Sequence, residues 1–348
     1  MKKLIVLMLA LALASTLTLS AFAENAPATV RTFGTLSMLN MTEEECAAFL
    51  EARSLIGRKL VEEGYAEQPE NASGPVPDGT MRKIVFYDTL DALLMALNAG
   101  DIDSIDIYQS VARYLCATND NLQMGVIYDM VKERNTFAQL AHNGINDNDF
   151  AFLMMKENAE LRDAFNAAIA DMKADDTLER LVQEQIENLI DGGEIEPVVL
   201  PKIDGADTIK VAVTGALPPM DYVAADGTPA GFNTAVLAEI GTRIGRNIEI
   251  VVVDSLGRAA ALASGTVDAV FWTRTSIEAQ KWAAETEVKY DANVAENKGS
   301  MTEEEIALMD EVDERINFKA YGAGDMPEGT IVTDSYFSDV LVPVELAR

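Results

Sequence analysis

The fold of this chain is decided by residues 208–275, which read TIKVAVTGALPPMDYVAADGTPAGFNTAVLAEIGTRIGRNIEIVVVDSLGRAAALASGTVDAVFWTRT. Three apolar runs in this stretch predict β-strands, at residues 209–213, 248–253 and 267–272. Two helix-period runs lie between them, at residues 234–244 and 259–263. Connections of a dozen or more residues between successive strands require crossovers, so the stretch predicts an α/β fold with a parallel sheet.

Short motifs inside this stretch narrow the fold class. They follow one another as Pro218-Pro219, Tyr222, Asp226-Gly227, Gly231-Phe232-Asn233, Ala261-Leu262, Gly265 and Asp268-Ala269. In this order and spacing they resemble the first lobe of the family 3 extracellular solute-binding proteins, the receptors of polar amino-acid ABC transporters. The resemblance implies a bilobal, periplasmic-binding-protein-like α/β fold, with two α/β lobes and a ligand cleft between them.

A repeat within the chain is consistent with two lobes. Residues 96–105 parallel residues 261–270, because each segment ends a helix, turns at a glycine and enters a strand that contains an aspartate. The alternative is that helix–glycine–strand is common chemistry for such a turn.

The order of the segments departs from the family. Residues 158–178 resemble the family's return segment, which follows lobe two and packs on lobe one, with Asp176 where glycine is usual. Here this segment precedes the lobe-one stretch. The chain therefore resembles a circularly permuted member of the family, which is physically feasible because the termini of compact domains often lie close together.

This reading divides the chain into five parts. Residues 1–23 form a signal peptide, 31–149 a lobe-two-like domain, and 150–191 the return strand and helices that pack on lobe one. Residues 192–207 form a linker with Pro197 and Pro201, and 208–348 form the lobe-one-like domain, with an acidic insertion near 280–328.

The first 23 residues indicate export. Lys2-Lys3 precede an apolar core, and Ala21-Phe22-Ala23 form a cleavage site. The alternative is a membrane anchor, although the apolar run is short for a span. We expect cleavage after Ala23 and a periplasmic or extracellular protein. The formal net charge of −30 disfavours nucleic acid as a partner.

The resemblance also implies a set of ligand contacts. These are Tyr222, Thr273, Arg274, Thr275, Gly34, Thr35 and Tyr108. In the family an aromatic residue stacks on the ligand, which corresponds to Tyr222, although this could equally be an ordinary half-buried tyrosine. An arginine clamps the ligand carboxylate through two parallel hydrogen bonds, but Glu278 stands at its usual place, so that Arg274 is a possible substitute. Tyr108 stands where the family has the aspartate for the amino group.

Other chemistry has little support in the sequence. The chain has one histidine, His142, and two cysteines, Cys46 and Cys116, which could form a disulfide or remain buried thiols. The carboxylates Asp101, Asp103 and Asp106 fit a solvated turn better than a catalytic pair. We expect no metal, no cofactor and no catalytic residue.

The expected function is therefore capture of a small polar, amino-acid-like solute for an ABC transporter permease, by a monomer and not by an enzyme. Because two clamp positions have changed, a sensory or interaction module with the same fold is the alternative. A small-molecule lyase on this fold is a third reading, without a convincing acid–base pair.

Overall fold

The structure is a computed structural model. It describes residues 29–36, 46–47, 61, 66–70, 80–128, 147–193, 197–254, 257–275 and 328–347. The expected signal peptide, His142, Glu278 and the expected acidic insertion up to residue 327 lie outside the described residues.

One large sheet runs through the described part of the molecule. Its strands follow in the order β12 (Asn247–Val252), β8 (Thr208–Val213), β13 (Ala269–Thr275), β7 (Asp147–Met155), β15 (Phe337–Leu346), β4 (Ser104–Tyr108), β1 (Val30–Leu36) and β3 (Met81–Tyr87). Two further strands branch from it, β14 (Thr330–Val332) on β7 and β5 (Leu122–Met124) on β15. The strands β8, β12 and β13 run parallel, which confirms the α/β fold class.

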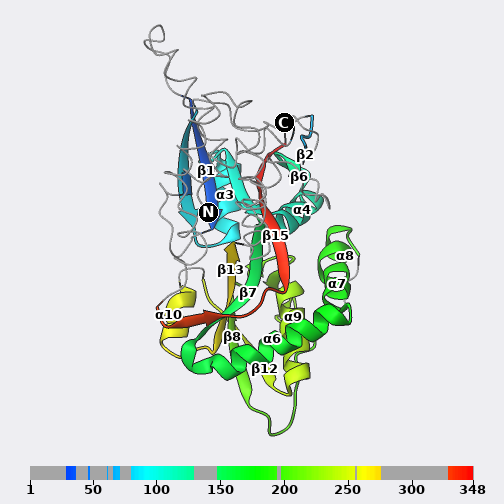
Figure 1. Cartoon of the computed structure of the whole chain (residues 1–348). Helices are drawn as coiled ribbons and strands as arrows, with labels where there is room; N and C mark the ends of the chain where they lie inside the picture. Colours follow the sequence, from blue (N-terminus) through cyan, green and yellow to red (C-terminus); the bar gives the residue numbers. More distant parts are fainter. Residues whose placement is uncertain are drawn as a thin grey trace, which may run out of the picture.

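The strand β15 divides the sheet into two lobes (Figure 1). Its first residues, Phe337–Val340, pair with β7, and its later residues, Leu341–Val344, pair with β4. We call the part with β7, β8, β12, β13 and β14 the lower lobe. The part with β1, β3, β4 and β5 is the upper lobe. Each lobe combines parallel strands with antiparallel partners, and β15 belongs to both.

Helices cover both lobes. The upper lobe carries α3 (Leu90–Ala99) and α4 (Gln109–Thr118). The lower lobe carries α9 (Phe232–Ile244), α10 (Gly257–Ala263), and a run formed by η2 (Lys156–Asn158), α6 (Ala159–Ala174), α7 (Thr177–Val182), the π-helical turn η3 (Gln183–Glu187) and α8 (Asn188–Ile190). Short strands complete the description: β9 (Ala216–Leu217), β10 (Asp221–Val223) and β11 (Pro229–Ala230) form one small sheet, and β2 (Ala66–Glu67) pairs with β6 (Ile127–Tyr128).

Local chemistry explains where the key helices begin and end. Thr89 caps α3 by accepting a hydrogen bond from the amide of Ala92 at 3.2 Å, and Gly100 ends the helix with φ of +78°. Gly231 precedes α9 with φ of +97°, and a Cβ there would lie 2.7 Å from the carbonyl oxygens of Pro219 and Met220. Only glycine fits this close approach, so the motif Gly231-Phe232-Asn233 is a packing requirement of the loop.

The segment before the linker packs against the segment after it. Phe165, Ile169 and Met172 of α6 are buried in the same core as Val211 of β8 and Phe232 of α9. The strand β7 pairs antiparallel with β13 along its length. The interior of the lower lobe is therefore built from both sides of the linker.

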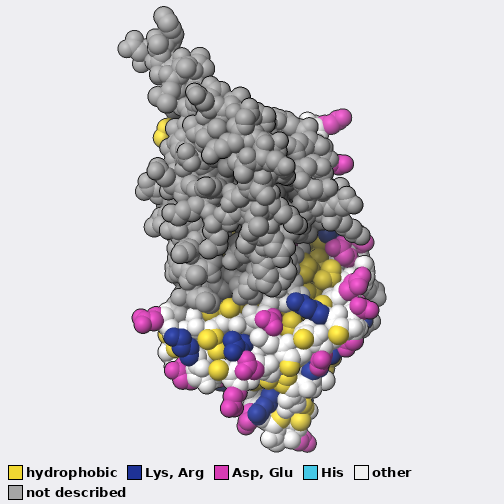
Figure 2. Space-filling view, in the orientation of Figure 1, with side chains coloured by type: hydrophobic (Ala, Val, Ile, Leu, Met, Phe, Trp, Pro, Cys, Tyr) yellow, Lys and Arg dark blue, Asp and Glu magenta, His cyan; other side chains and the backbone are white. Residues whose placement is uncertain are grey.

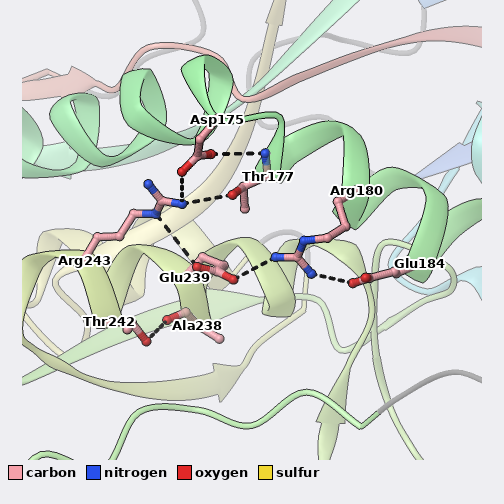
Figure 3. A network of polar contacts seen from close by, with 8 residues as sticks. All are labelled: Asp175, Thr177, Arg180, Glu184, Ala238, Glu239, Thr242 and Arg243. Atoms are coloured by element: carbon pink, nitrogen blue, oxygen red, sulfur yellow. Dashed lines mark hydrogen bonds and ion pairs between the residues drawn. The ribbon is translucent and has the colours of Figure 1, made fainter.

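Polar contacts reinforce this packing at the surface (Figure 3). Arg243 of α9 donates to the Asp175 carboxylate at 2.8 Å and to the Thr177 hydroxyl at 2.9 Å, at the junction of α6 and α7. Arg180 of α7 bonds Glu239 of α9 at 3.0 Å and Glu184 at 2.7 Å. Figure 2 shows acidic and basic side chains interspersed over the visible face of this lobe.

The strand β13 is longer than the sequence predicts. The third strand was expected to end at residue 272, but β13 continues to Thr275 because β7 pairs with it as far as Asn148. Thr273, Arg274 and Thr275 are thus strand residues.

The two cysteines do not form a disulfide. Cys46 and Cys116 are both free thiols, and burial raises the pKa of Cys116 to about 11.

Candidate functional site

The two lobes meet around Phe150 of β7, which is fully buried. Its ring makes edge contacts with Tyr108 of the upper lobe at 4.9 Å and with Phe271 of the lower lobe at 5.2 Å, measured between ring centroids. Phe337 of β15 lies 5.4 Å away in the same geometry. Tyr108 is therefore placed at the junction of the lobes, where sequence reasoning expected a ligand contact.

A basic side chain, Arg258 of α10, lies beside this aromatic cluster. It is half-buried, and its Nη1 donates to the Phe271 carbonyl oxygen at 2.8 Å. Its guanidinium carbon lies 5.9 Å from the centroid of the Phe271 ring, a cation–π distance. Burial lowers the pKa of Arg258, while Tyr108 and Asp221 act in the opposite direction. Arg258 thus lies beside the aromatic cluster in which Phe150 contacts both Phe271 and Tyr108.

A buried carboxylate, Asp221, organises the loop between β8 and α9. Asp221 accepts hydrogen bonds from the Thr214 hydroxyl at 2.5 Å, the Gly215 amide at 2.7 Å and the Asn233 side chain at 2.9 Å. Burial raises the pKa of Asp221, and these donors oppose that rise. Tyr336 donates to the other end of the Asn233 amide at 2.8 Å. The network fixes the loop that carries Tyr222.

Tyr222 lies on β10 and is half-buried. Burial raises its pKa first, and the phenol of Tyr114 on α4 raises it further. The described part of the chain thus offers phenol groups, an arginine and aromatic rings, which are able to form hydrogen bonds and charge contacts.

The other predicted contacts are placed differently. Thr35 is buried on β1, and its hydroxyl donates to the Asp106 carbonyl oxygen at 3.0 Å within the upper lobe. A Cβ on Gly34 would lie 2.5 Å from Ile102 and 2.7 Å from Leu93, so this glycine makes room for the hydrophobic core beneath α3. The backbone of Thr273, Arg274 and Thr275 lies opposite Phe150, Asp149 and Asn148 of β7, next to the junction.

Sequence reasoning missed three residues of the junction, namely Arg258, Asp221 and Tyr114. Arg258 is the only charged residue in the otherwise small and apolar run of α10, and this is the one signal that could have singled it out. Asp221 follows directly after Pro218-Pro219-Met220, but an aspartate next to a turn is normally solvated. Among the described residues, no group of three or more histidine, cysteine, aspartate or glutamate side chains could hold a metal ion.

One comparison with known proteins matches part of the chain. Residues 209–318 match the family model described as bacterial extracellular solute-binding proteins, family 3. The match confirms, over this segment, the resemblance found in the sequence. No curated protein sequence matches the chain.

Solved structures of binding proteins are similar at low identity. The ligand-binding component of an ABC-type import system from Staphylococcus aureus, with zinc bound, shares 10% identity at a TM-score of 0.36, covering 91% of this chain and 66% of that one. An ancestral arginine-binding protein bound to arginine shares 12% at a TM-score of 0.33, covering 92% and 84%. The binding protein AgaA from A. tumefaciens R10, in complex with agropinic acid, shares 11% identity at a TM-score of 0.35. The match covers 78% of this chain and 56% of that one. The chain thus spans less than two thirds of the length of the first and third of these proteins.

Proposed function

We propose that this protein captures a small polar, amino-acid-like solute between its two lobes and presents it to the permease of an ABC transporter. The observation that supports this most directly is the aromatic cluster at the junction, where Phe150 joins Tyr108 of the upper lobe to Phe271, the ring beside Arg258, in the lower lobe. A solute held by groups from both lobes favours their approach, because it gains contacts only when they are close.

The chemistry of the junction bears on the kind of solute. The guanidinium of Arg258 fits a carboxylate or another planar anion, and its half-buried position strengthens such a contact. Tyr222 and Tyr114 supply phenol groups for stacking and hydrogen bonding. We therefore assign to Arg258 the anion-binding role for which Arg274 was the candidate in the sequence.

The domain organisation is part of the proposal. The lower lobe combines residues 147–191 with the described residues of 208–275 and with residues 328–340, and the linker 192–207 stands between the first two parts in the chain. We propose that this arrangement is a circular permutation of the bilobal family fold. The antiparallel pairing of β7 with β13 and the packing of α6 on α9 support it.

Export is also proposed, from the charged start, apolar core and cleavage site of residues 1–23. Among the residues described, the structure has no helix that is both long and apolar enough to cross a membrane. We expect the mature chain to begin at Glu24 and to act as a monomer.

A sensory or interaction module is the second candidate. Tyr108 stands where the family has an acid for the ligand's amino group, and its ring packs against the buried Phe150. An ordinary α-amino acid therefore lacks one of its usual partners.

A thermal-shift screen of the mature protein tests the proposal. Amino acids, organic acids, polyamines and short peptides are each added at millimolar concentration, because a solute that binds only the native state raises its melting temperature. A hit is followed by calorimetric titration of Arg258→Met, Tyr222→Ala and Thr275→Ala, with the exposed Lys202→Met as control. Weaker binding is expected in the three junction variants only. No hit in the screen, or unchanged affinity in all three variants, would reject solute binding at this junction.

A further inference from the structure

The helix α4 carries the upper lobe's contribution to the junction. Tyr108 lies at its N-cap, and the Tyr108 ring contacts Phe150 of the lower lobe edge-on, with 4.9 Å between the ring centroids. The position of this helix relative to the lower lobe therefore decides whether the proposed binding groups face one another. Two contacts hold α4 in place, one with the lower lobe and one with the shared strand β15.

The first contact is an ion pair between the lobes. Arg113 of α4 donates from Nη1 to one carboxylate oxygen of Glu187 at 2.8 Å and from Nη2 to the other at 2.6 Å. Glu187 ends the π-helical turn η3 of the lower lobe, and Figure 1 shows α8, which follows it, lying beside α4. The two side chains are 34% and 29% exposed. Hydrogen bonding to the partner raises the pKa of Arg113 and lowers that of Glu187, so each side chain stabilises the charge of the other.

The second contact comes from β15, at the point where this strand passes from one lobe to the other. The carboxylate of Asp339 accepts a hydrogen bond from the Ser110 amide at 3.0 Å, in the first turn of α4. Ser110 and Arg113 are three residues apart and so lie on one face of the helix. This face is tied both to the crossing strand and to the lower lobe.

We propose that Arg113 and Glu187 are a positioning pair, which holds α4 against the lower lobe and thereby sets the affinity for the solute. The proposal rests on the proposed function, because the pair acts by bringing Tyr108 to the binding groups of the other lobe. Loss of the pair lowers the population of the closed arrangement, and the apparent affinity falls in proportion to that population.

A neighbouring ion pair shows why this contact differs from an ordinary surface pair. Arg180 and Glu184 are bonded at 2.7 Å in the same helical run, but both belong to the lower lobe and their side chains are 49% and 42% exposed. Pairs of this kind contribute little to stability and cannot affect the distance between lobes. Arg113 and Glu187 form two parallel hydrogen bonds and join two bodies. Glu184→Gln is therefore a matched control for Glu187→Gln.

The test measures closure and binding separately. Dyes are attached at Met95→Cys on α3 and Asp204→Cys in the linker, with Cys46 and Cys116 replaced by alanine, and single-molecule energy transfer reports the distance between the lobes. Without any solute, Glu187→Gln should shift the distribution towards longer distances, while Glu184→Gln should match the parent. Raising the salt concentration should open the parent but not Glu187→Gln, because salt screens the ion pair. The charge swap Arg113→Glu with Glu187→Arg should restore closure.

The second measurement is the Kd of the solute found in the screen. Glu187→Gln should raise it by about fivefold or more, and the charge swap should bring it back towards the parent. An energy-transfer distribution that is the same in the parent, Glu187→Gln and Glu184→Gln would overturn the proposal, whether or not a solute is found. Opening in Glu187→Gln without any solute in the screen would uphold the tie between the lobes and reject solute binding as its purpose.

Discussion

Replacement of Phe165 by alanine tests whether the two sides of the linker form one folding unit. The Phe165 side chain is fully buried on α6, and its ring contacts that of Phe152 edge-on at 5.7 Å. It belongs to the same core as Val211, Phe232 and Leu237, which follow the linker. A fully buried phenylalanine truncated to alanine costs about 3–5 kcal/mol, from lost transfer free energy and the cavity that remains. The loss should reach β8 and α9 although the substitution precedes the linker.

Amide hydrogen exchange followed by mass spectrometry measures where that loss is felt. At about 1.4 kcal/mol per factor of ten, a loss of about 3–5 kcal/mol in Phe165→Ala should accelerate the slowest amides of β8 and β12 by roughly 100- to 4,000-fold. Val199→Ala is the control, because Val199 is 81% exposed and its truncation removes no packing. If exchange rises in α6 and α7 but stays unchanged in β8 and β12, the segments on either side of the linker are independent domains and the reasoning is refuted.

Three further predictions follow from the same contacts. The two halves of the chain, residues 24–200 and 205–348, can be expressed separately. Neither should show a cooperative urea transition, because the lower lobe needs both halves. A cooperative transition in each half would contradict this. Burial raises the pKa of Asp339 to about 6, from an ordinary 3.8. Between these two pH values the native state holds a proton on Asp339 that the unfolded state has lost. The free energy of unfolding should therefore fall by about 3 kcal/mol as the pH rises from about 4 to 7. Urea titrations at several pH values should show that Asp339→Asn lacks this fall in unfolding free energy. An unchanged fall in the variant would show that Asp339 does not cause it. The pKa of Asp175 is about 2 because of hydrogen bonds with Thr177 and then Arg243, so Arg243→Met should raise it, as measured by carbon-13 NMR; no rise would show that Thr177 alone is responsible.

The sequence predicted the strands of the lower lobe well because its signals there are local. The apolar runs 209–213 and 248–253 correspond to β8 and β12 to within a residue. Asp176 stands where the family usually has glycine, and it adopts the left-handed conformation with φ of +60° between α6 and α7. The length of β13 could not be predicted, because its last residues are in a strand only through pairing with β7, which lies far away in the chain.

The site was harder to predict than the fold. A glycine within a strand, such as Gly34, indicates that something approaches closely, but the pattern does not distinguish a ligand from a packing helix. Here Leu93 of α3 and Ile102 take that space. Arg258 gave the opposite difficulty, since an arginine on a short helix is normally solvated. Only the packing of α10 on β13 brings its guanidinium to the Phe271 carbonyl oxygen.

The shared strand β15 also has a consequence for how the molecule folds. It comes after every other described strand in chain order, yet it lies in the middle of the sheet, between β7 and β4. Pairing between residues so distant in sequence forms slowly, since a long loop must close first. Until it forms, β7 and β4 each keep an open edge that can pair with strands of other molecules. A free peptide with the sequence of residues 337–346 would compete for these edges and slow refolding.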